Sequence, residues 1–157
     1  MKLGHKASSR RTMLAGIAAS LAVGLAARAQ TSAPSDRKGV AMRLRLAFAD
    51  QEFTATLEDN PSARDLLSTV PLDLTIDDYA TNEKIAYLPR KLTEEGSGAF
   101  GNERPGDLCY YAPWGNLALF YAGYRWSRGL IRLGRLDGGF EPLLVGGKFP
   151  LRIERLS

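Results

Sequence analysis

The stretch GDLCYYAPWGNLALFYAG, residues 106–123, contains two apolar runs joined by a short corner. Aromatic and apolar side chains dominate both runs, and this composition favours β-strands. Residues 112–116 between them include a proline and a glycine, two residue types that are typical of turns. The stretch therefore predicts strands at 107–112 and 117–122, joined by a tight corner that carries Trp114 and Asn116.

Further strand patterns surround this corner. In residues 42–48, apolar side chains alternate with arginine and alanine, which is the period of a half-buried strand. A second alternating segment, 52–58, follows a short turn at Asp50 and Gln51, so the two segments should form a hairpin. The remaining strand candidates span residues 72–76, 84–88, 130–136 and 151–155.

One short helix is expected after the first hairpin. Asn60 can cap the free backbone amides of a helix, and Pro61 has the backbone angle of the first helical position. Pro71 is expected to end this helix. Many short strands, one early helix and closely spaced turns predict a mainly β fold, a small closed β-barrel that occupies residues 41–157.

Residues 1–29 have the pattern of a signal peptide. Four basic residues precede an apolar run at 13–27, and Ala27-Arg28-Ala29 matches a cleavage site between small residues. The run holds about 15 residues, fewer than the roughly 20 that a membrane-spanning helix needs. We therefore expect cleavage near Ala29, no stable membrane anchor afterwards, and a polar flexible linker at 30–40.

The segment Ser9-Arg10-Arg11-Thr12-Met13-Leu14 resembles a twin-arginine export signal. Met13 and Ala15 depart from the residues usual at their positions, so a general secretory signal remains the alternative. Either route predicts a periplasmic or secreted protein.

Removal of the signal changes the charge and the available chemistry. Residues 1–29 hold five of the 21 Lys and Arg and none of the 17 Asp and Glu, which leaves 16 basic and 17 acidic side chains. This balance gives no global basic face for nucleic acid. The single histidine, His5, is lost as well, which argues against Ser-His and Cys-His catalysis.

Cys109 is the only cysteine, so no intramolecular disulfide can form. Its place in an apolar strand favours a buried packing residue over a catalytic thiol or an intermolecular disulfide.

Residues 105–121, together with EKIAYLP at 83–89 and GLIRLGRL at 129–136, resemble the small bacterial cyclophilin-like proteins. The resemblance extends over about residues 41–145 and implies a compact β-barrel like that of the cyclophilins, which are peptidyl-prolyl isomerases. Those enzymes carry an arginine followed by phenylalanine and glutamine, with a histidine and aromatic residues at the proline pocket. The mature chain has no histidine, and its only glutamines are Gln30 and Gln51, so the enzymatic signature is not matched.

The candidate ligand-binding residues gather around the corner, with two arginines added from flanking segments. They are Tyr111, Trp114, Asn116, Phe120, Arg104 and Arg125. In a functional interpretation, Trp114 projects beside a groove and the Asn116 amide bonds to a peptide or a small ligand. In a structural interpretation, Trp114 caps the barrel core and Asn116 serves the turn.

Three other patterns give weaker predictions. Residues 96–101 match G-x-G-x-x-G but lack a helix after them, so we expect a mobile rim loop and no nucleotide cofactor. Two groups of charged residues are expected to be solvent-facing, with a cation site and anionic-ligand contacts as the respective alternatives. They are Asp73, Asp77, Asp78 and Glu83, and Arg125, Arg128, Arg132 and Arg135.

Two functions follow from these patterns. The first is an exported domain that binds a peptide or a small molecule at an aromatic rim without strong catalysis. The second is a periplasmic peptidyl-prolyl isomerase in which Arg90, Arg104 or Arg125 weakens the amide resonance. A structural role in an oligomer is a third possibility, and the catalytic residue, the ligand and the oligomeric state stay open. No metal or cofactor is predicted.

Overall fold

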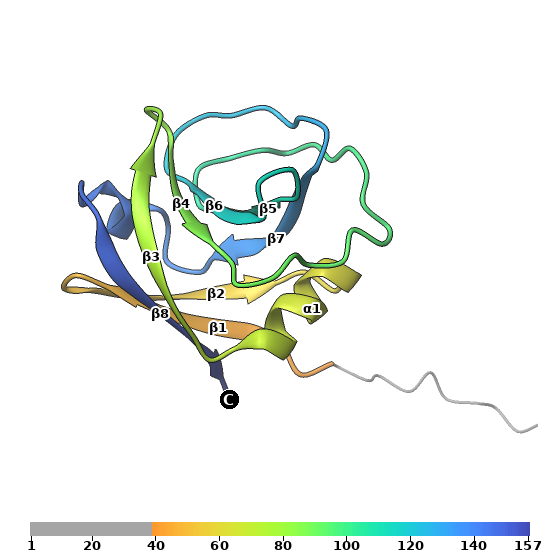
Figure 1. Ribbon diagram of the computed structural model, residues 1–157, viewed down its shortest axis with the longest axis horizontal. Helices are drawn as coiled ribbons and strands as arrows, with labels where there is room; N and C mark the ends of the chain where they lie inside the picture. The colour runs from red at the N-terminus through yellow and green to blue at the C-terminus, as the bar shows by residue number, and fades with distance from the viewer. Residues whose placement is uncertain (1–38) are drawn as a thin grey trace, which may run out of the picture. The chain divides into compact units, whose positions relative to one another are not determined.

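The computed structural model describes residues 39–157 and consists of a closed β-barrel with one α-helix and one short 3-10 helix (Figure 1). The strands are β1 (Arg43–Phe48), β2 (Gln51–Leu57), β3 (Leu72–Tyr79), β4 (Glu83–Tyr87), β5 (Asp107–Tyr111), β6 (Asn116–Phe120), β7 (Leu130–Leu136) and β8 (Phe149–Leu156). They pair antiparallel in the order β1-β2-β7-β5-β6-β4-β3-β8 and then close. The predicted mainly β barrel is confirmed. The predicted signal peptide and most of the linker lie outside the described residues.

The first hairpin follows the alternation seen in the sequence. Along β1, inward-facing residues such as Leu44 and Leu46 are fully buried, while the arginines between them are partly exposed. β1 and β2 pair with Leu46 opposite Phe53. The turn lies one residue earlier than predicted, because Ala49 adopts the left-handed backbone conformation with φ 50° and Gln51 already belongs to β2.

The helix α1 (Pro61–Thr69) begins as predicted. The Oδ1 atom of Asn60 accepts a hydrogen bond from the Ala63 amide at 2.8 Å, which satisfies one free donor of the first turn. Ala63 and Leu66 are fully buried in the main core. The helix ends at Thr69, and Val70 is extended because the residue before a proline disfavours the helical conformation.

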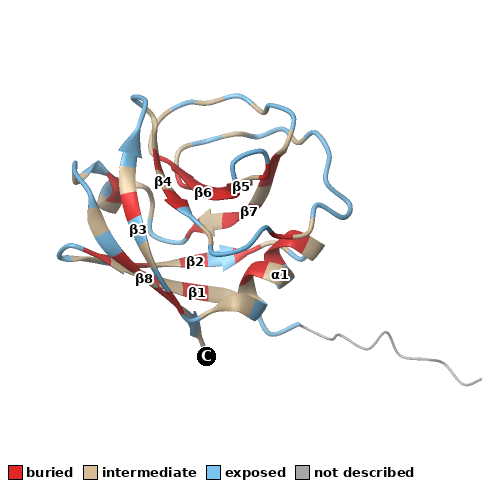
Figure 2. Cartoon of the chain, in the orientation of Figure 1, coloured by how far each residue is buried: buried red, intermediate tan, exposed pale blue. Residues whose placement is uncertain are grey.

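The barrel has a main core inside and a smaller apolar cluster outside. In β6, Leu117 and Leu119 belong to the main core, whereas Ala118 and Phe120 belong to the outer cluster together with Cys109 and Leu130. Both faces of β6 are therefore buried, as Figure 2 shows for the strands at the centre of the view. Tyr124 and Trp126, from residues 121–129, the β6–β7 connection, pack against this outer cluster. The outer face of β6 is therefore covered by the β6–β7 connection, and the candidate binding cavity lies on this face.

Several element bounds differ from the prediction, among them those of β8, which begins at Phe149, two residues before the predicted segment. β3 continues to Tyr79, three residues beyond the predicted segment, and β4 begins at Glu83. A 3-10 helix, η1 (Glu141–Leu144), precedes β8 and buries Leu143. Within residues 39–157, no helix is long and apolar enough to cross a bilayer.

Candidate functional site

A cavity of about 380 Å³ lies on the outer face of the barrel, beside β4, β6 and the β6–β7 connection. Its lining residues are Tyr79, Asn82, Glu83, Ile85, Tyr111, Trp114, Asn116, Ala118, Phe120, Tyr124, Arg125, Ser127 and Leu130. We call it the outer-face cavity. Its volume falls in the range of small-molecule sites, about 300–1,000 Å³.

Five of the six predicted site residues line this one cavity, and they are Tyr111, Trp114, Asn116, Phe120 and Arg125. The sixth, Arg104, lies at a different hollow beside Arg135 and Leu136. The structure therefore brings the corner residues together and separates Arg104 from them.

The corner holds Trp114 at the cavity edge. The amides of Trp114 and Gly115 both donate to the Tyr111 carbonyl, and Gly115 takes the φ of 72° that this reversal requires. Gly129 packs so closely on Pro113 that an added Cβ would lie 2.6 Å from the proline ring. The β6–β7 connection thus fixes the corner from one side.

Trp114 is 46% exposed and does not cap the barrel core, contrary to the structural interpretation of the sequence. Its ring meets Tyr79 edge to face at 5.3 Å between centroids and Tyr111 at 5.4 Å. We call these three residues the aromatic corner. Nearly perpendicular rings present faces in several directions, which suits the enclosure of a ligand group.

Asn116 is 1% exposed and leaves one polar atom without a partner. Its Nδ2 donates to the Leu117 carbonyl at 3.0 Å, while its buried Oδ1 accepts no hydrogen bond from the described residues. A buried acceptor without a partner costs about 1–3 kcal/mol. Asn116 lies in β6 with extended backbone, so the positive φ of the turn belongs to Gly115.

Phe120 and Tyr124 form one wall of the cavity. Their rings stack at 3.6 Å between centroids with an interplanar angle of 7°. The Tyr124 hydroxyl donates to Asp107 at 2.7 Å, and burial raises the pKa of this phenol, which keeps it a donor. Sequence reasoning missed Tyr124 because this residue lies in the β6–β7 connection and its role depends on Asp107, which lies on strand β5.

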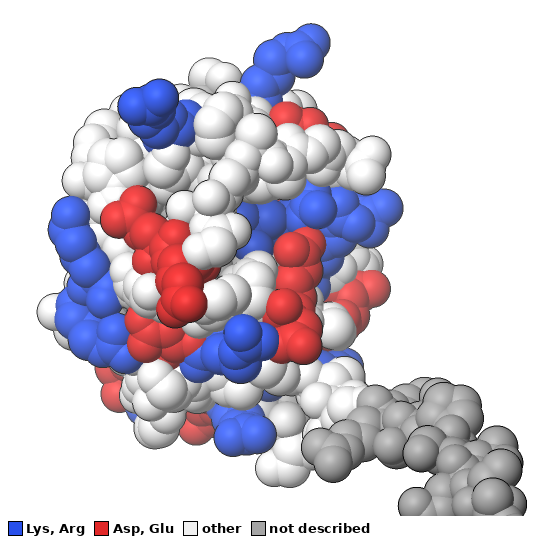
Figure 3. All heavy atoms as spheres, turned by 90° about the vertical axis from the view of Figure 1, so that its right-hand side faces the viewer, with Lys and Arg blue, Asp and Glu red and all other residues white. Residues whose placement is uncertain are grey.

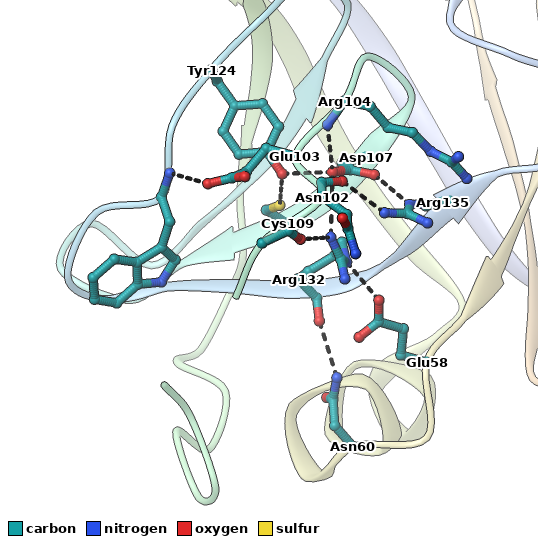
Figure 4. A network of polar contacts seen from close by, with 12 residues as sticks. Glu58, Asn60, Asn102, Glu103, Arg104, Asp107, Cys109, Tyr124, Arg132 and Arg135 are labelled. Atoms are coloured by element: carbon teal, nitrogen blue, oxygen red, sulfur yellow. Dashed lines mark hydrogen bonds and ion pairs between the residues drawn. The ribbon is translucent and has the colours of Figure 1, made fainter. Parts of the chain in front are cut away.

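Asp107 is fully buried and anchors a polar network (Figure 4). Its carboxylate accepts from the Arg135 side chain at 2.7 Å and from the Arg104 backbone amide at 3.1 Å, and Arg132 lies 3.8 Å away. Arg132 also pairs with Glu58 at 2.6 Å. The prediction that Arg132 faces solvent is wrong, since its side chain is 14% exposed, whereas Arg135 is 30% exposed and faces solvent in part.

Glu83 contributes the only acidic side chain to the cavity lining. Burial raises the pKa of its carboxyl, and no ion pair within residues 39–157 offsets this effect. In the sequence Glu83 belonged to an acidic group, but the other three members have cationic partners elsewhere. Asp73 pairs with Arg152, Asp77 with Lys148 and Asp78 with the buried Lys84.

The three arginines considered for isomerisation lie in different places. Arg90 pairs with Asp65 at 2.6 Å, and Arg104 lies at the separate hollow. Arg125 alone lines the outer-face cavity, and it is exposed.

Cys109 belongs to the outer cluster and is fully buried, as predicted. Burial raises the pKa of its thiol to about 12, so the reactive thiolate is absent at neutral pH.

The glycine-rich residues 96–101 lie in a connection between β4 and β5 that contains neither strand nor helix. The strand-turn-helix context of a dinucleotide site is therefore missing.

Among residues 39–157, no three His, Cys, Asp or Glu side chains are grouped as metal ligands. On the face in Figure 3, Lys and Arg side chains lie among Asp and Glu side chains.

Several lining residues were not predicted, notably Tyr79, Asn82 and Ile85 from β3, β4 and the turn between them. They reach the cavity because β4 pairs with β6, with Glu83 opposite Phe120. To predict these lining residues one would need to know that β4 pairs with β6. Hydrophobic periodicity identifies strands but does not give their order in the sheet.

Comparison with known proteins identifies a matching family and a solved structure of similar fold. A family model described as the cyclophilin-like family matches residues 46–154, and no curated protein matches the sequence. The fold is similar to the solution structure of a hypothetical protein from Archaeoglobus fulgidus, with a TM-score of 0.62 and 20% sequence identity. That match covers 77% of this chain and 99% of the other, and at this identity it shows the fold alone. Since the family model spans most of its length, the chain belongs to the cyclophilin-like family.

Proposed function

We propose that the protein is a binding domain that holds a peptide or a small ligand in the outer-face cavity without strong catalysis. The observation that carries the proposal is the Asn116 Oδ1 atom, a buried acceptor without a partner in a residue that lines the cavity. A ligand donor that bonds to this atom would remove its desolvation cost. The aromatic corner supplies apolar contact area around it.

The weakness of the catalysis follows from the groups available. Prolyl isomerisation must overcome a barrier of about 18–20 kcal/mol, and a catalyst lowers it by donating hydrogen bonds that weaken amide resonance. Residues 39–157 contain no histidine, and Arg125 is the only cationic side chain in the cavity lining. Because Arg125 is exposed, water competes for its hydrogen bonds.

A prolyl isomerase is the second candidate, and the position of Arg125 favours it. This guanidinium lines the same cavity as the aromatic corner, which is an arrangement that can enclose a proline ring and donate to the adjoining peptide group.

Exchange spectroscopy on short Xaa-Pro peptides separates the two functions. A binding domain shifts peptide signals without faster cis/trans exchange, and Trp114→Ala abolishes the shifts while Tyr87→Ala preserves them. Tyr87 is a matched control because it is exposed on β4 but does not line the cavity. Accelerated exchange that disappears in Arg125→Ala would establish the isomerase, and the absence of both effects would count against both functions.

Export to the periplasm or beyond remains part of the proposal and rests on residues 1–29. Replacement of both Arg10 and Arg11 with lysine should leave uncleaved precursor in the cytoplasm if the twin-arginine route is used. Normal export of this variant would favour the general secretory route, and cytoplasmic wild-type protein would refute export.

A further inference from the structure

Glu83, the acidic residue of the outer-face cavity, forms no ion pair with the described residues. Burial raises the pKa of Glu83, and no lysine or arginine of residues 39–157 forms an ion pair with it. The other acidic residues of its turn region are paired, as Asp78 with Lys84 at 2.6 Å illustrates. A desolvated carboxylate without a partner is costly, and a bound cation would offset that cost.

The aromatic corner adds a second attraction for positive charge. Tyr79 and Tyr111 stand at 89° and 79° to the Trp114 ring, so the three rings do not share a plane. A cation within about 6 Å of a ring face is attracted by the ring quadrupole, and tryptophan gives the strongest attraction. Clusters of aromatic side chains are used to recognise quaternary and methylated ammonium groups.

Arg125 lines the outer-face cavity but forms no ion pair with Glu83. It also lines a second hollow, with Glu103 and Tyr124. The pKa of Glu103 is lowered by the hydrogen bond from the Trp126 amide and, further, by the charges of Arg125 and Arg132. Arg125 makes no comparable contribution at Glu83, whose pKa is raised by burial alone.

We infer that the outer-face cavity binds an organic ammonium ion, with the alkylated nitrogen between the aromatic corner and the Glu83 carboxylate. The inference rests on the proposed function and names the chemical class of its ligand. In this arrangement the Oδ1 atom of Asn116 accepts from a hydroxyl or amide hydrogen elsewhere in the ligand. Quaternary and alkylated amines fit both attractions, since their charge is spread over apolar groups.

The test compares choline with 3,3-dimethylbutan-1-ol, which has the same shape and hydroxyl group but no charge. Calorimetric titration of the full chain should give choline an affinity at least about tenfold higher than that of the alcohol. Glu83→Gln and Trp114→Ala should each weaken choline about tenfold or more, and Tyr87→Ala should leave it unchanged. Urea denaturation of each variant verifies that it is folded, and Trp114→Phe retains a ring face should the alanine variant be unstable.

The outcomes separate this inference from the proposed function. Equal affinity for choline and the alcohol, or choline binding that survives Glu83→Gln, would overturn the ammonium class and leave the binding cavity in place. The ammonium class is also overturned, and the binding cavity retained, if neither choline nor the alcohol binds while Xaa-Pro peptides shift the Trp114 signals. If the probes and the peptides all fail to bind, the inference and the proposed function are both wrong.

Discussion

At the scale of single residues, the Asp107 carboxylate fixes two loops by hydrogen bonds, the β6–β7 connection and the β4–β5 connection. It accepts from the Tyr124 hydroxyl and the Arg104 amide, and its partner Arg135 is 30% exposed. Asp107→Asn removes the negative charge of the carboxylate. The positive charges of Arg132 and Arg135 then remain partly buried without this partner. We expect a loss of about 2–3 kcal/mol, below the 3–5 kcal/mol of a fully buried pair because Arg135 reaches water. Urea denaturation measures this change.

The matched control is Asp73→Asn. Asp73 pairs with Arg152 at the same 2.7 Å, but its side chain is 78% exposed. Exposed pairs contribute about 0–1 kcal/mol, so this variant should be nearly as stable as wild type. Equal effects of the two substitutions would contradict the role assigned to Asp107.

Glu83 gives a pH-dependent prediction. Because burial disfavours its charged form, its pKa is higher in the folded than in the unfolded state. Its contribution to stability is therefore present at low pH and lost as the pH rises through the folded pKa. Glu83→Gln should raise the unfolding free energy at about pH 7, and this gain should vanish at about pH 3.5, below the ordinary carboxyl pKa of about 4.3.

Denaturation of the wild-type protein and the Glu83→Gln variant across this pH range provides the measurement. A variant that is less stable than wild type at neutral pH would show that the carboxylate has a stabilising partner. Gain of stability with loss of choline binding is the pattern expected of a residue kept for its ligand.

The residue-level predictions succeeded where one local signal was sufficient. Asn60 caps its helix and Cys109 is buried, and both roles are determined by near neighbours in the chain. Arg132 was wrongly assigned to solvent because its partners, Glu58 and Asp107, come from other elements.

At the scale of elements, β7 joins β2 through a short seam. Only three residue pairs are in register there, and Gly134 lies opposite Leu57. A Cβ at Gly134 would lie 2.2 Å from the Thr56 carbonyl oxygen, which is backbone and cannot rotate away. Gly134→Ala should therefore separate the strands and cost about 2–3 kcal/mol.

Gly138→Ala provides the control, since nothing lies within 4 Å of its added Cβ and its φ is not positive. Its stability in urea should match wild type within about 0.5 kcal/mol. A Gly134→Ala protein as stable as this control would show that the seam opens without cost.

The elements themselves were largely predictable, because alternation identifies strands that have one buried face. β7 has the predicted bounds. β6 is buried on both faces, so its sequence lacks the alternation that would have shown which residues face outward, into the outer cluster. The 3-10 helix Glu141–Leu144 was missed because four residues give too short a period to recognise.

At the scale of the whole molecule, closure of the barrel decides which residues meet. The sequence predicted a closed barrel and five residues of the cavity, all within residues 111–125. Tyr79 and Glu83 join them only because β4 pairs with β6. Strand order depends on contacts between distant segments, which hydrophobic periodicity does not encode.

The two tryptophans provide the most direct test of the outer-face cavity as a binding site. Trp114 lines this cavity, whereas Trp126 donates its indole N–H to the Leu130 carbonyl at 3.0 Å and lines a neighbouring hollow. In a ¹H–¹⁵N spectrum of the protein, titration with choline and with Xaa-Pro peptides should shift the Trp114 indole signal and leave that of Trp126 in place. A shift of Trp126 alone, or of neither signal, would contradict a binding site in the outer-face cavity.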